Sequence, residues 1–259
     1  MKKLIAALFT LFIAGTAVLA QGSWSPANAD LTFPRTLADS LAIPAFRASL
    51  AAPERRALYL SVWNGANLAV PAGNATDGDR FTRSVIAREA AFVLLADRKP
   101  AGDSLAPLDP SDRDALRARV ITLLEAANTT VEVGTFWTFY TPWQHRSKEL
   151  IGYLIAYDLL KGAGVPPASL GVSKGRLLDF SANLYQRSMA SYTFLNLKFF
   201  TYQFNNHSIM TASALGMAAV VFSENTSSNG NYQPQNWINA GLYNLDNTLW
   251  MENGTYPRV

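Results

Sequence analysis

Apolar residues recur at helical spacing along most of the chain, and this periodicity limits the possible folds more than any other feature. Stretches of this kind cover residues 50–66, 79–98, 109–127, 148–164, 173–191, 209–222 and 234–251. A repeat every three or four residues places the apolar side chains on one face of a helix. Strand-like sequence is sparse, and the best example, residues 129–141, could equally be a loop. The sequence therefore predicts an all-α protein.

Proline and glycine mark where several of these helices begin and end. Pro53 suits the first turn of a helix, and Ser111, after Pro110, is the expected N-cap of the third stretch. The fourth stretch is expected to end at Gly162 or Gly164, since glycine is common just beyond a helix C-terminus.

Residues 209–222 are apolar on all sides, which predicts a helix that is buried all round. A buried helix among amphipathic ones suits two layers of helical hairpins, as in an α/α toroid, and a helical bundle is the simpler alternative. We expect a leader and a first helix in residues 21–50 and an incomplete toroid domain in residues 51–259. Because the last residues resemble a turn, we interpret the chain as the N-terminal part of a longer protein.

The first twenty residues are typical of a secretory signal peptide. Lys2 and Lys3 precede an apolar stretch at positions 4–19, which is followed by a small residue at position 20. This stretch is short for a membrane span, although an uncleaved anchor is the alternative. We therefore expect a secreted or periplasmic protein with no stable membrane insertion after cleavage.

Charge and cysteine content narrow the possible partners. The chain has 22 basic and 19 acidic residues, and without Lys2 and Lys3 the balance is 20 to 19, a net charge of +1. With no sustained basic run, nucleic acid is not an expected partner. The chain has no cysteine, so disulfides and thiolate metal sites are excluded, and the core alone must hold the fold together.

Three polar residues, Asn205, Asn206 and His207, stand together at the head of the apolar stretch. Either asparagine could cap the helix that follows, and the N–H groups of the first turn would attract an anion such as a carboxylate. The same positive potential disfavours a charged imidazole, so His207 is expected to stay neutral and able to accept a proton. The plainer alternative is a cap beside a histidine bonded to the backbone.

Three segments resemble polysaccharide lyases of the heparinase II/III and alginate lyase type. "FNNHSIMTASALGMAAVVF" (204–222) is similar to their Asn-His segment on an inner toroid helix, and "RSKELIGYLIAYDLL" (146–160) is similar to another toroid helix. "ENGTYPRV" (252–259) resembles the Asp-Gly-Ser-Tyr-x-Glu-Gly segment that precedes the catalytic tyrosine in that family. The resemblance runs from about residue 50 to the end of the chain.

The resemblance implies β-elimination on a uronic acid polysaccharide, without a metal or another cofactor. Asn206 matches the asparagine that neutralises the uronate carboxylate, and His207 matches the histidine beside it. Tyr256 matches the aromatic residue of the Gly-Ser-Tyr element, whereas the catalytic tyrosine would follow Val259. Arg258 stands at the position where the family segment has glutamate, so the chain departs from the family pattern there. On this basis we expect the chain to be inactive by itself.

Other residues are candidates for the walls of a sugar cleft. Trp143 could stack on a pyranose ring, Arg146 could pair with a carboxylate, and His145 lies between them in the sequence. The alternative is an aromatic core cluster covered by an arginine. Tyr202 and Gln203 are close enough to Asn206 in sequence to line the same cleft. Trp237 and Trp250 fit the core, because both lie on an apolar helix face.

Two further functions stay open from the sequence. A helical carbohydrate-binding protein could have kept the toroid without catalysis, and a glycoside hydrolase could share the fold. A hydrolase needs two carboxylates that flank the scissile bond. The spacing of Glu149, Asp158 and Asp179 gives no reason to pair any two of them.

Overall fold

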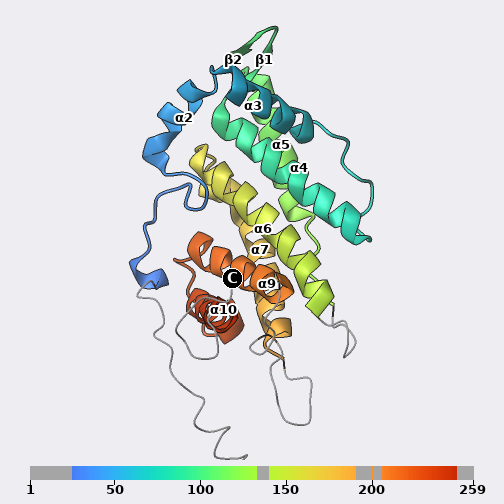
Figure 1. Cartoon of the computed structure of the whole chain (residues 1–259), viewed down its shortest axis with the longest axis vertical. Helices are drawn as coiled ribbons and strands as arrows, with labels where there is room; N and C mark the ends of the chain where they lie inside the picture. Colours follow the sequence, from blue (N-terminus) through green and yellow to red (C-terminus); the bar gives the residue numbers. More distant parts are fainter. Residues whose placement is uncertain (1–24, 133–139, 191–199, 201–205, 250–259) are drawn as a thin grey trace, which may run out of the picture.

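The computed structural model describes residues 25–132, 140–190, 200 and 206–249, and they are mostly helical (Figure 1). The α-helices are α2 (Ile43–Ser49), α3 (Pro53–Ala66), α4 (Asp77–Ala96), α5 (Pro110–Glu125), α6 (Tyr140–Gly162), α7 (Gly171–Ser188), α9 (Asn206–Val221) and α10 (Pro234–Leu249). Short 3-10 helices are η1 (Pro26–Asn28), η2 (Ser40–Ala42), η3 (Pro167–Leu170) and η4 (Gly230–Tyr232). Strands β1 (Lys99–Ala101) and β2 (Ser104–Ala106) form an antiparallel hairpin. The predicted helical class is confirmed.

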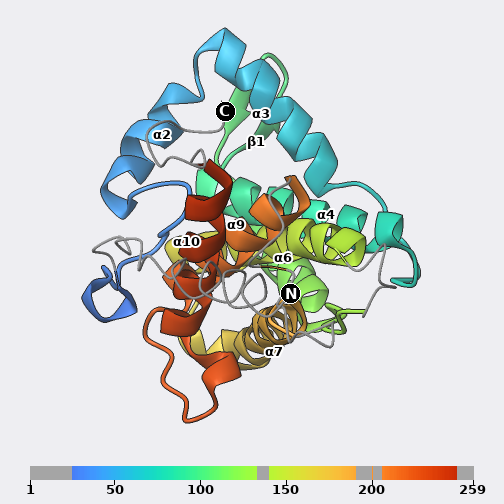
Figure 2. The same ribbon diagram turned by 60° about the horizontal axis from the view of Figure 1, so that its bottom comes forward.

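Helices α4, α6 and α9 lie side by side and run in the same direction (Figures 1 and 2). Near the start of α4 and α6, Asp77 bonds to His145, and further along, Gly152 packs against Ser84. Between α6 and α9, the hydroxyls of Ser147 and Thr211 are 3.1 Å apart. The rings of Tyr157 and Phe222 then meet near the far ends of these two helices. The three helix N-termini therefore lie at one end of the molecule.

The neighbouring helices run back in the opposite direction. In α3, Gly65, near the C-terminal end, packs against Glu89 of α4. Tyr59, nearer the start of α3, donates a hydrogen bond to the carbonyl of Arg98, just beyond the end of α4. Arg113 of α5 pairs with Asp97 just after α4.

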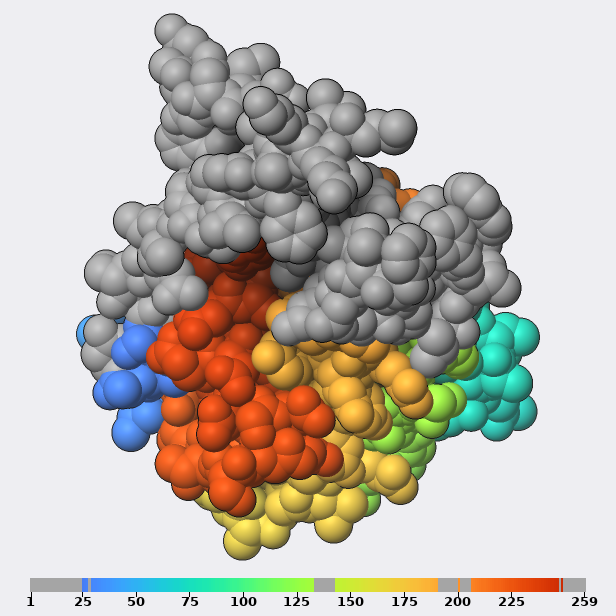
Figure 3. All heavy atoms as spheres, turned by 90° about the horizontal axis from the view of Figure 1, so that it is seen from below, coloured from blue at the N-terminus to red at the C-terminus, as the bar shows by residue number. Residues whose placement is uncertain are grey.

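Helices α7 and α10 also run antiparallel, α7 to α6 and α10 to α9. A short connection that includes η3 leads from α6 back into α7, and Gly241 of α10 touches Ala212 of α9. The segment before α10 rests on α7, where Tyr232 donates a hydrogen bond to Asp179 at 2.9 Å. Figure 3 shows the red-orange surface of the C-terminal elements against the yellow surface of α7. Along the sequence, the parallel helices α4, α6 and α9 thus alternate with helices that run antiparallel to them.

The most enclosed helix is α6, not α9. Residues 152–160 of α6 are all buried between α4, α7 and α9. The prediction that residues 209–222 are buried on every side is wrong, because Ser213 is exposed and Met217 and Val220 are only half-buried. These three residues line a groove of about 300 Å³ with α10. An apolar composition does not tell which side of a helix has a neighbour.

One predicted helix cap is corrected, and the choice between strand and loop for residues 129–141 is decided against a strand where the structure describes them. Asp109, not Ser111, caps α5, and it forms a reciprocal capping box with Asp112. Pro110 is therefore the first helical residue. The strand-like segment 129–141 contains no strand in its described residues, since 129–132 are irregular and α6 already begins at Tyr140. Residues 133–139 lie outside the described residues.

The leader is fastened to the ends of α6 and α9. Asp158 of α6 is fully buried, and its carboxylate accepts hydrogen bonds from the backbone N–H groups of Arg35 and Thr36. The guanidinium of Arg35 donates to the carbonyl of Val221 at 3.1 Å and pairs with Glu224 at 2.9 Å. Arg35 therefore caps the C-terminal end of α9. Within the described part of the chain, no helix has the length and apolar character needed to cross a membrane.

Candidate functional site

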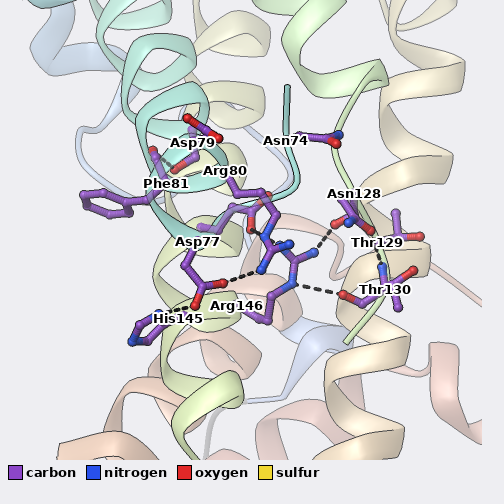
Figure 4. Close-up of polar contacts among 12 residues, drawn as sticks. Asn74, Asp77, Asp79, Arg80, Phe81, Asn128, Thr129, Thr130, His145 and Arg146 are labelled. Carbon is purple, nitrogen blue, oxygen red and sulfur yellow. Dashed lines mark hydrogen bonds and ion pairs between the residues drawn. The ribbon is translucent and has the colours of Figure 1, made fainter. Parts of the chain in front are cut away.

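A histidine–aspartate pair joins the starts of α4 and α6. Nδ1 of His145 lies 2.7 Å from Oδ2 of Asp77, the first residue of α4 (Figure 4). An ionised carboxylate only accepts hydrogen bonds, so the proton of a neutral His145 sits on Nδ1. The lone pair of Nε2 is then able to accept a proton or a hydrogen bond from a ligand.

Arg80 holds the aspartate of this pair in place. Its guanidinium bonds to Oδ1 of Asp77 and, at 3.0 Å, to the carbonyl of Ala75. Burial alone would raise the pKa of Asp77, but hydrogen bonds from Arg80 and His145 bring that pKa below its usual value. Asp77 therefore stays ionised and keeps the His145 ring oriented.

Behind the pair lies a buried network of charges. Arg146 is fully buried, bonds to Glu149, and donates to the carbonyls of Asn128 and Thr130, the latter at 3.0 Å. Nε of Arg80 lies 3.8 Å from the Glu149 carboxylate. Burial raises the pKa of Glu149 to about 7, although both arginines oppose the shift. Arg146 thus supports the site from within the core and does not face a ligand, which corrects the prediction that it binds a substrate carboxylate.

A cavity of about 230 Å³ opens beside the histidine–aspartate pair. It is lined by Asp77, Gly78, Phe81, His145 and Lys148. Phe81 is 45% exposed, and Figure 4 shows its ring on the same side of the two helices as His145. An exposed aromatic ring, an ammonium group and an imidazole suit a ligand that has an apolar face and a negative charge.

Asn206 and His207 lie at the same end of the molecule, at the start of α9. Asn206 is exposed and His207 is half-buried. The pKa of His207 is lowered, first by burial and then by the electrostatic effect of the neighbouring His145 and Lys148. Thr211 ties this turn to α6, since its hydroxyl bonds to the His207 carbonyl at 3.2 Å and to Ser147. The two histidines of the chain therefore lie close enough for His145 to contribute to the pKa shift of His207.

Trp143 does not occupy the predicted position in a cleft. It is 1% exposed and packs in the core, so its ring cannot stack on a sugar as predicted. Trp237, predicted to be in the core, is fully buried, and its indole N–H donates to the carbonyl of Asn231 at 2.7 Å. Four other candidates lie outside the described residues: Tyr202, Gln203, Trp250 and Tyr256.

Four of the five residues that line the cavity were not identified from the sequence: Asp77, Gly78, Phe81 and Lys148. Asp77, Phe81 and Lys148 become neighbours only because α4 and α6 pack in parallel. Phe81 lies one turn after Asp77 at a helix start, and only this position could have drawn attention to it.

The carboxylates considered for a hydrolase are dispersed. Glu149 bonds to Arg146, Asp158 to the leader and Asp179 to Tyr232. Asp77 is the one carboxylate among the residues that line the cavity. The described residues also contain no group of three or more His, Asp or Glu placed to hold a metal ion.

No family model, no curated protein and no solved structure matches the chain.

Proposed function

We propose that the chain is part of a secreted or periplasmic lyase that cleaves a uronic acid polysaccharide by β-elimination. The observation that supports this proposal best is the environment of His207. It is a histidine whose pKa is lowered at a helix start, and it lies close enough to His145 and Lys148 of the cavity for both to contribute to that shift. A neutral imidazole beside positive charges suits proton abstraction next to a bound carboxylate.

The proposed reaction needs a neutralised carboxylate and a base. Asn206 and Lys148 bind the uronate carboxylate, and the N–H groups at the start of α9 add to the positive potential. This makes the C5 proton more acidic, and Nε2 of His207 removes it. The C4–O bond then breaks as the C4=C5 double bond forms.

The leaving oxygen must also gain a proton. The family resemblance assigns this role to a tyrosine. Among the described residues that line the cavity, His145 can also carry a proton on Nε2 for transfer, because Asp77 accepts a hydrogen bond from Nδ1 and orients the ring. Phe81 gives the sugar ring an apolar face to lie on.

The arrangement of the helices supports the same proposal. Three parallel helices with antiparallel helices returning beside them are what one wall of an α/α toroid requires. We propose that α4, α6 and α9 belong to the inner ring of such a toroid. The cavity then lies at the end where the N-termini of the inner helices meet.

The test is an elimination assay with the full-length gene product. Alginate, heparan sulfate, chondroitin and hyaluronan are supplied in turn, and the ultraviolet absorbance of the unsaturated uronate product is followed. We expect turnover with at least one polymer and a loss of more than a hundredfold in Asn206→Ala and His207→Ala. The control Asn64→Ala, which removes an exposed asparagine of α3, should retain wild-type activity.

Two other results would contradict the lyase proposal. Release of reducing ends without the absorbance would indicate a hydrolase. Saturable polymer binding without any cleavage would indicate a carbohydrate-binding protein. A circular dichroism spectrum of each variant separates loss of chemistry from loss of the fold, and an unfolded Asn206→Ala would point to a helix cap alone.

A further inference from the structure

A second pocket, at the opposite end of α4, is lined by three arginines. Arg47 comes from α2, Arg56 from α3 and Arg98 from the turn between α4 and β1, and Ser104 and Leu105 of β2 close the pocket. Its volume is about 300 Å³. A helix rises about 1.5 Å per residue, so the length of α4 separates this pocket from the candidate functional site by about 30 Å.

The three guanidinium groups have no acidic partner in the described part of the chain. No carboxylate there forms an ion pair with Arg47, Arg56 or Arg98, and none lines the pocket. Asp97 is close in sequence, but it is paired with Arg113, at 2.8 Å. The pocket therefore keeps three positive charges together without neutralising them.

Two of these arginines are fixed by the backbone. Arg47 donates from Nε and Nη2 to the carbonyl of Leu95, at 2.9 and 2.8 Å. Arg98 donates to the carbonyl of Asp97 at 2.9 Å, and its own carbonyl accepts from the Tyr59 hydroxyl at 2.6 Å. Bonds to neutral carbonyls hold the side chains in place and leave their charge intact. The remaining N–H donors of Arg47 and Arg98 are therefore preorganised for a ligand.

We propose that this pocket binds a sulfate or phosphate group. A tetrahedral dianion offers several acceptor oxygens to arginine forks, which bind such groups with two parallel hydrogen bonds. It would also supply the negative charge that the residues lining the pocket lack. This inference does not depend on the proposed lyase function, because the two pockets share no residue.

The test is calorimetric titration of the full chain with inorganic sulfate and inorganic phosphate at constant ionic strength. We expect saturable one-site binding of at least one anion and much weaker binding of acetate. Arg56→Ala should lower the affinity at least tenfold. Arg55→Ala removes the same charge from the neighbouring, exposed position outside the pocket, and should leave the affinity within twofold of wild type.

Further arms of the experiment identify the source of the anion and keep the test decisive. Competition by a sulfated or a phosphorylated monosaccharide would show which ester the pocket accepts. If Arg56→Ala fails to fold, Arg56→Lys keeps the charge without the fork and should still weaken binding at least threefold. Equal losses in Arg55→Ala and Arg56→Ala, or no saturable binding, would overturn the proposal.

Discussion

At the scale of single residues, the site depends on side chains whose protonation is set by burial. His207 was expected to be neutral because of the helix dipole, and its pKa is indeed lowered, but burial is the first cause. Glu149 shows the same effect more strongly, because burial raises its pKa to about 7 beside Arg146. The network behind the cavity therefore changes its charge near neutral pH.

Glu149 should make the stability of the protein depend on pH. Its pKa is raised on folding from about 4.5 to about 7, so the folded state binds a proton that the unfolded state releases. The free energy of unfolding of the wild type should therefore fall between pH 4.5 and pH 7, relative to that of Glu149→Gln. Urea denaturation across this range measures the difference.

Glu54→Gln, at an exposed position of α3, is the control and should follow the wild type. If wild-type stability instead rises with pH relative to Glu149→Gln, then Arg146 keeps Glu149 ionised and the assignment is wrong.

Part of the candidate site could be predicted from single residues, and part could not. Asn206 and His207 were singled out because polar residues at the head of an apolar helix follow general capping rules, and the structure places them at the start of α9. Trp143 was misassigned because α6 begins at Tyr140, not near Lys148, which turns the indole into the core. Asp77 was missed because its contact with His145 depends on how α4 and α6 pack, and a single sequence does not reveal helix packing.

At the scale of elements, close backbone contacts fix how α9 and α10 meet. A Cβ atom added at Gly241 would lie 2.9 Å from the Ala212 carbonyl oxygen, which belongs to a neighbouring backbone. The positions of most helices could be predicted from periodicity, as α3, α4 and α7 show. The β1–β2 hairpin and the exposed side of α9 could not, since short strands and missing neighbours leave no periodic signal.

Two glycine substitutions should have opposite effects. Gly241→Ala should lower the free energy of unfolding by roughly 1–3 kcal/mol, because the two helices must move apart. Gly175→Ala in α7 has open space around the new methyl group and should raise it by about 0.5–1 kcal/mol. Urea denaturation of both variants tests the packing, and a stabilising Gly241→Ala would show that the α9–α10 contact is looser than described.

At the scale of the whole molecule, the leader joins helices that are distant in sequence. The fully buried carboxylate of Asp158 accepts a hydrogen bond from the Thr36 hydroxyl at 2.6 Å and from two backbone N–H groups. This fastening was not predicted, because the leader was taken only as an extended segment with a first helix.

Removing this acceptor should destabilise the protein strongly. Asp158→Ala leaves the N–H groups of Arg35 and Thr36 without their acceptor, and we expect a loss of about 3 kcal/mol. Thermal and urea unfolding would measure it. Asp103→Ala in the exposed hairpin turn should change stability by less than about 0.5 kcal/mol, and an equally small effect of Asp158→Ala would refute the fastening.

The proposed lyase needs both histidines at one site for an acidic sugar, with His207 uncharged. The most direct measurement is NMR of the two imidazole C–H signals in the full chain, assigned with His145→Gln. We predict that His207 titrates below pH 6.5 and that a uronate oligosaccharide shifts both signals along one saturation curve, which Asn206→Ala weakens. A His207 that titrates at or above pH 6.5, or signals that the oligosaccharide does not move, would contradict the account.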